Sequence, residues 1–256
     1  MRLVSLNLWG GMLFDPLMGF LKDSEQDTDI FCFQEVFNSE SEIVDKVDNR
    51  FNLFAILEKT LPEFQGYFSP AQDGFDYRHS VDKRISFGLA VFVRKTIPIE
   101  SLDVFFIFGD RNSMKGDDEN TLPCNAQCIT VIVPDDKKIS ICNAHGMPEW
   151  PKTDNPARLK QSTIIKDFLD RRGNTQILCG DLNLFPETKS IQILEKDMRN
   201  LVNEFEVKDT RGKLHQLDPH VSDYVFISKG IAVLNFSAPD MGISDHLPLI
   251  LDFSIS

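Results

Sequence analysis

Two short polar motifs, each set directly against an apolar run, constrain the fold of this chain more than any other feature. Asp181 and Asn183 follow the apolar run at 177–179, and Asp245 and His246 stand immediately before the mostly apolar run at 247–253. A carboxylate at the end of a buried strand is costly unless a cation or hydrogen-bond donors meet it there. We therefore expect the two strand ends to lie together in one polar site.

The length and composition are those of an ordinary globular chain. It has 256 residues, of which 42% are hydrophobic and 26% charged, and it contains no internal repeat or Gly/Ser-rich linker. We therefore expect a single domain that spans residues 1–256. No apolar run approaches the roughly 20 residues that cross a bilayer, and the N-terminus lacks a signal-peptide pattern. We expect a cytoplasmic monomer with no stable membrane association.

The charge and the cysteines argue against several classes of protein. A net charge of −12 and a pI near 4.8 speak against a broad basic surface for gripping a nucleic-acid backbone. They do not exclude a nuclease, because an acidic enzyme can meet phosphate through a metal ion and a few local cations. Five cysteines, an odd number, give no sign of a disulfide framework. Cys124 and Cys128 have the spacing of half a zinc site, but no second pair completes it.

The secondary-structure pattern mixes short strands with helices. An Asn-Pro pair at 155–156 predicts a helix through about residue 170, and a capping-box pattern at Ser39 and Glu42 predicts a helix through about residue 60. A further helix is expected near 188–196, and polar stretches at 71–86 and 109–123 predict long loops. Apolar, β-branched runs predict strands at 3–6, 30–34, 88–94, 102–108, 129–133, 139–143, 175–179, 224–227, 233–236 and 247–253. This number of strands indicates a layered α/β protein with more than one simple parallel sheet.

Polar side chains gather at the ends of these predicted strands. They are Asn7, Glu35, His145, Asp181, Asn183, Asp223, Asp245 and His246. The set consists of hard oxygen donors with two imidazoles and no thiolate, which suits Mg²⁺ or Mn²⁺ better than zinc or copper. Magnesium in proteins binds through one or two carboxylates together with substrate phosphate. The pattern therefore favours phosphoester chemistry.

Six segments, in order along nearly the whole chain, resemble the endonuclease/exonuclease/phosphatase superfamily. They are Ser5-Leu6-Asn7-Leu8-Trp9, Phe33-Gln34-Glu35-Val36, Asn143-Ala144-His145-Gly146, Gly180-Asp181-Leu182-Asn183, Ser222-Asp223-Tyr224-Val225-Phe226 and Ser244-Asp245-His246-Leu247-Pro248. The superfamily includes pancreatic deoxyribonuclease, apurinic endonucleases, neutral sphingomyelinases, inositol polyphosphate 5-phosphatases and tyrosyl-DNA phosphodiesterases. The resemblance implies an α/β fold: a four-layer α/β/β/α sandwich of two packed mixed sheets flanked by helices.

The resemblance also implies a metal site. Glu35 would be the principal ligand of Mg²⁺ or Mn²⁺, helped by Asn7 and Asp245. Some superfamily members carry an acidic residue two positions after the first asparagine, where this chain has Trp9. The metal shell would be thinner there, or Trp9 would form an aromatic wall.

Catalytic roles follow from the same resemblance. Asp181 would orient or deprotonate the attacking water, and Asn183 would hold the phosphate or that water. His246 would contact the phosphoryl oxygens, with Asp223 or Asp245 fixing its tautomer. His145 would touch the phosphate or assist the leaving group. For His145 a plain turn histidine is the alternative, since Gly146 follows it and no carboxylate partner can be assigned.

Substrate contacts are expected from Trp150, Arg158 and Arg84. Trp150 follows His145 in a proline-rich loop and would stack on a base, sugar or apolar leaving group, unless it packs on its own loop. Arg158, near the start of the helix at 155–170, would approach phosphate bidentately, or be an ordinary solvated arginine. Arg84 belongs to a locally basic stretch that would attract phosphate, or that is an ordinary solvated loop.

The sequence therefore predicts a Mg²⁺-dependent phosphoester hydrolase that cleaves by metal-assisted in-line attack of water. The leading version is a phosphodiesterase or nuclease acting on nucleic acid or a nucleotide-like substrate. The alternatives are a phosphomonoesterase, or a hydrolase of inositol phosphates or sphingomyelin, with the same fold. A non-catalytic phosphate-binding module is the rival from another class. It would have lost Glu35, Asp181 or His246, and all three are present.

Overall fold

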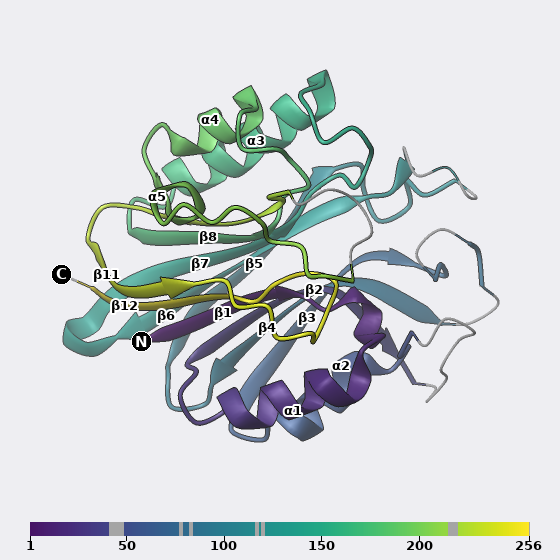
Figure 1. The fold of residues 1–256 in the computed structure, drawn as a ribbon, viewed down its shortest axis with the longest axis horizontal. Helices are drawn as coiled ribbons and strands as arrows, with labels where there is room; N and C mark the ends of the chain where they lie inside the picture. Colours follow the sequence, from purple (N-terminus) through teal and green to yellow (C-terminus); the bar gives the residue numbers. More distant parts are fainter. Residues whose placement is uncertain are drawn as a thin grey trace.

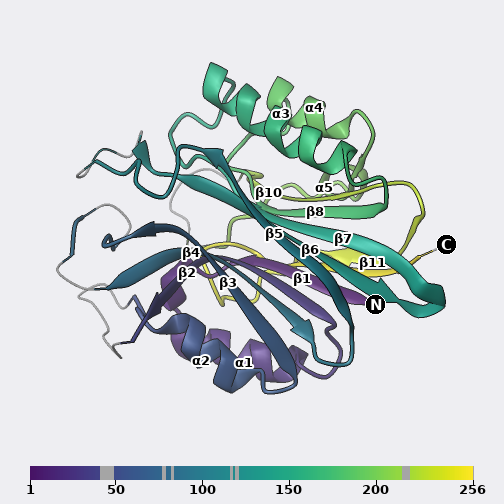
Figure 2. The same cartoon turned by 180° about the vertical axis from the view of Figure 1, so that it is seen from behind.

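The protein is built from two six-stranded sheets packed face to face, with helices on both outer faces (Figures 1 and 2). The computed structural model describes residues 1–40, 49–76, 79–81, 84–115, 118, 121–214 and 220–255. The layers follow one another as helices, sheet, sheet, helices, so the α/β/β/α sandwich expected from the sequence is confirmed.

The first sheet has the strand order β11-β12-β1-β2-β4-β3. Its strands are β1 (Arg2–Asn7), β2 (Ile30–Ser39), β3 (Phe64–Asp73), β4 (Ile85–Arg94), β11 (Ile231–Ser237) and β12 (Leu249–Ile255). Helices α1 (Phe14–Ser24) and α2 (Leu53–Thr60) cover its outer face (Figure 1). β1 and β2 run parallel, so Asn7 and Gln34 are register partners at the same end of the sheet. A 3₁₀ turn, η1 (Trp9–Gly11), follows β1.

The second sheet has the strand order β5-β6-β7-β8-β10-β9. Its strands are β5 (Ile99–Phe108), β6 (Cys124–Val133), β7 (Lys137–His145), β8 (Thr175–Asp181), β9 (Arg199–Asn200) and β10 (Asp223–Ile227). Helices α3 (Pro156–Asp170), α4 (Lys189–Glu195) and α5 (Leu201–Glu204) lie on its outer side (Figure 1). β7 and β8 run parallel and pair His145 with Asp181 at one end. The turn η3 (Pro134–Asp136) joins β6 to β7.

Two buried amides, Gln34 and Asn143, form one of the polar links between the two sheets. Gln34 on β2 donates to Oδ1 of Asn143 on β7 over 2.6 Å, and Asn143 donates back to the carbonyl of Phe33 over 2.9 Å. Because both amides are buried, these bonds fix the relative position of the two sheets. Both residues lie close before the polar strand ends, so the link holds the two halves of the site together.

The predicted helix from Ser39 is wrong at its start. Ser39 is the last residue of β2, where it pairs with Ile85 of β4, and the helix α2 begins only at Leu53. The second half of the capping-box pattern, Glu42, lies outside the described residues. Pairing with β4 therefore overrides the local capping signal at Ser39. Across the described part of the chain, no helix has the length and apolar character to cross a bilayer.

Candidate active site

The polar ends of β1, β2, β7 and β8 converge where the two sheets meet. Two glycines permit the close approach of the segments from the second sheet. A side chain on Gly180, which has φ +130°, would place its Cβ 2.0 Å from the carbonyl oxygen of Ala144. One on Gly146 would stand 2.3 Å from the carbonyl oxygen of Leu182. Glycine at these positions lets the segment after β7 lie directly against the segment after β8.

Glu35, Asn7, His145 and Asp181 form one half of the site, which we call the Glu35 half. Asn7 donates through Nδ2 to Glu35 Oε1 over 2.9 Å and to Asp181 Oδ2 over 3.3 Å. His145 Nε2 lies 3.7 Å from Glu35 Oε1 and 3.9 Å from Asp181 Oδ2. The expected convergence of residues from distant strands therefore exists in the structure.

The backbone is strained at two residues of the site. Glu35 has φ 56° and Asn183 has φ 54°, both in the left-handed region that non-glycine residues avoid. Glu35 sits in an irregularity of the β2–β4 register between Phe33 and Val36, which turns its carboxylate out of the normal alternation of the strand. Strain of about 1–3 kcal/mol per residue persists where the surrounding structure imposes it, typically at functional sites.

A divalent cation fits the chemistry of the Glu35 half. Ligand atoms of Glu35, His145 and Asp181 all lie within 4.8 Å of one another. Two carboxylates share the single donor Asn7 Nδ2, and His145 Nε2 is buried without a hydrogen-bond partner among the described residues. Such a crowded acidic group is stabilised by a cation. Asn7 Oδ1 accepts from the Trp9 amide over 3.0 Å, so Asn7 now turns its nitrogen, not its oxygen, toward Glu35.

His246 and Asp223 form the second half of the site, which we call the His246 half. His246 Nδ1 lies 2.9 Å from both carboxylate oxygens of Asp223. Asp223 Oδ2 also accepts from Thr210 Oγ1 over 2.8 Å and from Ser222 Oγ over 3.1 Å. All of these residues are buried. The carboxylate of Asp223 therefore holds the Nδ1–H tautomer of His246 in a fixed orientation.

Burial governs the protonation of this half. It lowers the pKa of His246 to about 3, with the positive charge of Arg211 acting in the same direction. Burial raises the pKa of Asp223, although Arg211 and Thr210 oppose the shift. The free protein thus holds a neutral His246 at neutral pH.

Asp181, a member of the Glu35 half, also faces the His246 half. His246 Nε2 is 3.6 Å from Asp181 Oδ2, the same oxygen that faces Asn7 and His145. Burial and the charge of Asp223 would raise the pKa of Asp181, but His246, Lys152 and His145 outweigh them, and the pKa is lowered. Its other oxygen, Oδ1, accepts from the amide of Asn183 over 2.9 Å. Asp181 is therefore ionised at neutral pH, with Oδ2 directed into the site.

Asn183 and Asp245 complete the set expected from the sequence. Asn183 Nδ2 donates to the carbonyl of Gly146 over 3.1 Å, which ties the loop after β8 to the loop after β7. Asp245 Oδ1 is 3.8 Å from His246 Nε2, and burial raises the pKa of Asp245. Asp245 Oδ2 lies 3.6 Å from Arg211 Nη1. The metal role expected for Asp245 stays a proposal, because its carboxylate lies close to His246 and Arg211.

Arg158 requires a correction. We expected it to bind substrate, but it is 0% exposed. Its guanidinium donates to the backbone carbonyls of Pro151 over 2.8 Å, Thr153 over 2.9 Å and Met147 over 3.2 Å, and also to the carbonyl of Glu149. These acceptors occupy alternate positions of the loop after β7. Arg158 is therefore a clamp that shapes this loop, and backbone carbonyls already occupy both of its Nη atoms.

Trp150 and Arg84 lie at the surface. Trp150 is 58% exposed, and its ring makes edge contacts with Phe185 at 5.8 Å and His220 at 6.2 Å between centroids. Phe185 follows Asn183 by two residues, so this aromatic group borders the loop after β8. Arg84 is exposed just before β4, and within the described ranges it makes no hydrogen bond or ion pair with the residues of either half.

Lys152 and Arg211 are two site residues that the sequence analysis missed. Lys152 is 5% exposed, and burial lowers its pKa, although the charges of Asp181 and Asp223 oppose the shift. Arg211 forms a β-bridge with His246. The available signals were weak: a lysine two residues after Trp150, and a Thr-Arg-Gly segment at 210–212.

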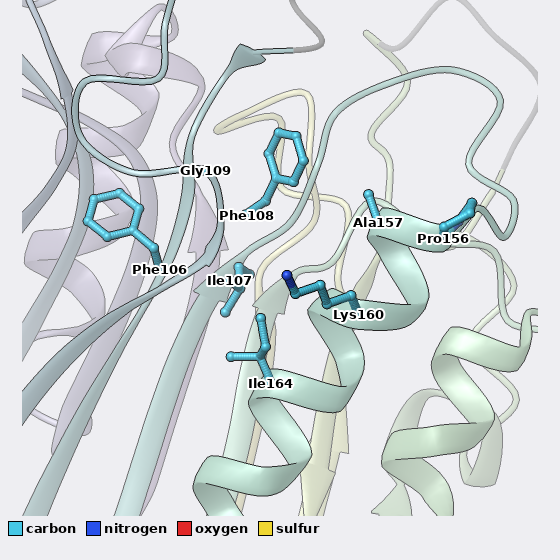
Figure 3. Close-up of a pocket in the computed structure, with 8 residues that line it drawn as sticks. All are labelled: Phe106, Ile107, Phe108, Gly109, Pro156, Ala157, Lys160 and Ile164. Atoms are coloured by element: carbon cyan, nitrogen blue, oxygen red, sulfur yellow. The ribbon is translucent and has the colours of Figure 1, made fainter.

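A separate hollow of about 440 Å³ lies between β5 and α3 (Figure 3). Phe106, Ile107 and Phe108 come from the strand side, and Lys160 and Ile164 come from the helix. None of the residues of the Glu35 and His246 halves lines it. It is not part of the candidate active site.

Comparisons with known proteins agree with the geometry. The sequence model of the Endonuclease/Exonuclease/phosphatase family matches residues 4–246. No curated protein matches the chain. Among solved structures, an endonuclease/exonuclease/phosphatase from Bacteroides vulgatus aligns with a TM-score of 0.74 at 18% identity, covering 100% of this chain and 98% of that chain.

Two further solved structures carry more specific names. The mannosyl-6-phosphatase Bt3783 of Bacteroides thetaiotaomicron aligns with a TM-score of 0.71 at 16% identity and covers 100% of both chains. The human Nocturnin catalytic domain with a bound sulfate aligns with a TM-score of 0.68 at 18% identity, covering 100% of this chain and 93% of that chain. At these identities the likeness shows a shared fold.

Proposed function

The chain belongs to the endonuclease/exonuclease/phosphatase family, and from this premise we propose that it is a Mg²⁺- or Mn²⁺-dependent hydrolase that cleaves phosphoesters by in-line attack of water. Members of this family are hydrolases of phosphoester bonds. The observation that carries the proposal is Asp181 Oδ2, an ionised carboxylate oxygen that faces His145, Asn7 and His246 together. One acidic atom thus stands between a cation site and a fixed histidine.

The Glu35 half would hold the divalent ion. Glu35 is the proposed principal ligand, Asn7 and Asp245 are proposed helpers, and His145 Nε2 lies close enough to contribute. When bound, the ion would neutralise phosphoryl charge and polarise the attacking water. Asn7 would have to rotate its amide to offer Oδ1, because Nδ2 now faces Glu35.

Asp181 is the proposed general base. Its Oδ1 is occupied by the amide of Asn183, so Oδ2 is the atom that would receive the proton of the attacking water. Asn183 holds this geometry through Gly146 and stays close to the phosphate or the water. A positioned base of this kind contributes about 10²–10⁴-fold to a rate.

His246 is the proposed stabiliser of phosphoryl charge. Entry of an anionic phosphate favours the protonated imidazole, because an opposite charge nearby raises the pKa of a histidine. Nδ1–H would remain on Asp223, and Nε2–H would donate to a phosphoryl oxygen as negative charge develops. His145 would assist the phosphate or the leaving group from the other side of Asp181.

The sequence favours a phosphodiester substrate, as in a nuclease, and Trp150 with its exposed ring supports a planar group beside the cleaved bond. Arg84 would add an electrostatic contact at the rim. A phosphomonoester is the second candidate, supported by the name of the mannosyl-6-phosphatase with the same fold. Both substrates use the same water, base and metal.

We also propose that the protein acts as a single domain and a monomer in the cytoplasm. All five cysteines are free and buried, which supports a reducing compartment. Light scattering of the purified chain tests the monomer.

A substrate panel tests the proposed function. Single- and double-stranded DNA, RNA, abasic DNA, inositol phosphates and sphingomyelin are incubated with Mg²⁺ or Mn²⁺, with and without EDTA. The Glu35→Gln variant serves as the blank for contaminating hydrolases. We expect metal-dependent cleavage by the wild type alone. Turnover that is equal in the blank and the wild type would refute the assignment.

A further inference from the structure

Lys152 is held inside the site by its loop. Arg158 donates to the carbonyls of residues 147, 149, 151 and 153. These hydrogen bonds fix the backbone of the residues between them, including Lys152. The carbonyl of Lys152 itself accepts from the amide of Phe185 over 2.9 Å. Its Nζ is buried and has no hydrogen-bond partner among the described residues. A buried ammonium without an acceptor is costly, so the fold holds a charge that the chain itself does not satisfy.

Arg211 reaches the site from the opposite loop. The segment 210–212 lies along 245–247, where Gly212 donates to the Asp245 carbonyl over 2.7 Å and Leu247 donates to the Thr210 carbonyl over 2.8 Å. The Arg211 side chain is only 11% exposed. Within the described part of the chain, its Nε and Nη1 find no hydrogen-bond acceptor, although Nη1 is 3.6 Å from Asp245 Oδ2.

Lys152 and Arg211 act electrostatically on the same groups of the site. Burial lowers the pKa of Lys152, the charges of Asp181 and Asp223 act to raise it, and those of Arg211 and Arg158 act to lower it. Both Lys152 and Arg211 also act on Asp223 and on His246. Two cations that repel each other thus act on one histidine–aspartate pair, and a ligand of opposite charge would offset their repulsion.

The open donors match the oxygens of a terminal phosphate. Lys152 Nζ and Arg211 Nε and Nη1 need acceptors in addition to those engaged by His246 and a metal. A phosphodiester offers two non-bridging oxygens and one negative charge. A phosphomonoester offers three such oxygens and a charge of about −1.5 to −2 at neutral pH. The larger number of acceptors and the higher charge fit the donor set better.

We propose that Lys152 and Arg211 form a clamp for the dianionic phosphoryl group, so that the preferred substrate of this site is a phosphomonoester. The inference rests on the proposed function and names its substrate class. The substrate class inferred here, a phosphomonoester, differs from the phosphodiester that the sequence favours.

The test compares p-nitrophenyl phosphate with bis(p-nitrophenyl) phosphate, a monoester and a diester with the same leaving group. Lys152→Met, Lys152→Gln, Arg211→Met and Arg211→Gln are measured beside Lys160→Met, a lysine exposed in the separate hollow of Figure 3. We expect the wild type to prefer the monoester in kcat/KM. Each Lys152 or Arg211 variant should lose about 10–100-fold on the monoester, the size of a charge-assisted hydrogen bond. The diester should change much less, and Lys160→Met should match the wild type.

Phosphate binding supplies a readout that does not require turnover. Calorimetric titration with inorganic phosphate, with Mg²⁺ present, should show affinity weakened about 10–100-fold in the Lys152 and Arg211 variants. Lys152→Arg and Arg211→Lys should restore part of it. If the wild type cleaves no substrate but binds phosphate through both residues, the proposed function is wrong and the Lys152–Arg211 phosphate site is supported. Equal losses on monoester and diester, or unchanged phosphate affinity, would overturn the clamp, because the cations would then only neutralise carboxylates.

Discussion

The two halves of the site are built on opposite principles. In the His246 half, the acceptors of Asp223 are filled by His246, Thr210 and Ser222. In the Glu35 half, two carboxylates share one amide donor, and His145 Nε2 has no hydrogen bond within the described ranges. One half is complete without a ligand, and the other has the composition of a cation site.

The difference assigns separate tasks to the two halves. A satisfied, buried pair positions a proton donor with little reorganisation. A crowded acidic group gains most from a divalent ion. Removing a residue from the Glu35 half should therefore cost activity with little loss of stability. Changing the His246 half should cost less activity and should alter stability with pH.

Glu35→Gln gives the largest expected effect. The substitution keeps the shape of the side chain and a polar contact for Asn7 but removes the charge that binds the ion. We expect kcat to fall by about 10³-fold, the size of several kcal/mol of lost charge stabilisation. Steady-state kinetics with saturating Mg²⁺ measure the loss, and thermal unfolding serves as the control. A variant that unfolds at much lower temperature would contradict the division of tasks.

Asp181→Asn should be next, with a loss of about 10²–10³-fold in kcat. The amide still accepts from the Asn183 N–H, but it cannot take a proton at the position of Oδ2. Because the base acts in the transition state, binding of inorganic phosphate should persist. If affinity and rate fall together, Asp181 is a ground-state ligand and not the base.

Asp223→Asn tests the fixed tautomer, with an expected loss of about 10–100-fold in kcat. The oxygen of the new amide would be claimed by Thr210 and Ser222, which donate to Asp223 Oδ2. The NH₂ group would then face His246 Nδ1 and exclude its proton. In the pH–rate profile of this variant, the part that depends on the protonation of His246 should disappear. An unchanged profile would show that Asp223 does not act through the histidine.

The smallest expected effect is the loss of folding stability as the pH falls. His246 has its pKa lowered from 6.5 to about 3 in the folded protein, so below pH 6.5 the unfolded chain binds the extra proton. The stability that this neutral histidine contributes is present above 6.5 and is lost as pH falls toward 3. Between about pH 7.5 and about pH 5, the wild type should lose roughly 2 kcal/mol more than His246→Gln. Denaturant unfolding at both pH values measures the difference, and equal losses would mean that His246 is charged in the fold.

Much of the fold could be predicted from local signals. The Asn155 cap and Pro156 mark the start of α3, and α4 lies within the helix expected near 188–196. The strand ends could be located because an apolar run stops at a polar residue. The helix predicted from Ser39 fails because strand pairing with Ile85 decides the conformation there. Helix α1 and strand β3 were not predicted from their patterns.

The side chains from loops were the least predictable part of the site. Arg158 lies near the N-terminus of α3, a position that suggests a phosphate contact. The direction of its guanidinium depends, however, on the loop that folds around it. Lys152 and Arg211 lie on loops without a motif, and only the path of the backbone brings them to Asp223. Sequence patterns thus locate the strand-end residues, whereas loop cations require the structure.

Direct titration with Mn²⁺, followed by electron paramagnetic resonance, is the most direct test of the central claim that the Glu35 half holds a divalent ion. Wild-type protein should bind Mn²⁺ and release it to excess Mg²⁺. Glu35→Gln should lose about 10–100-fold or more in affinity, whereas Lys160→Met should bind as the wild type does. Mn²⁺ affinity that is the same in wild type and Glu35→Gln would contradict the account.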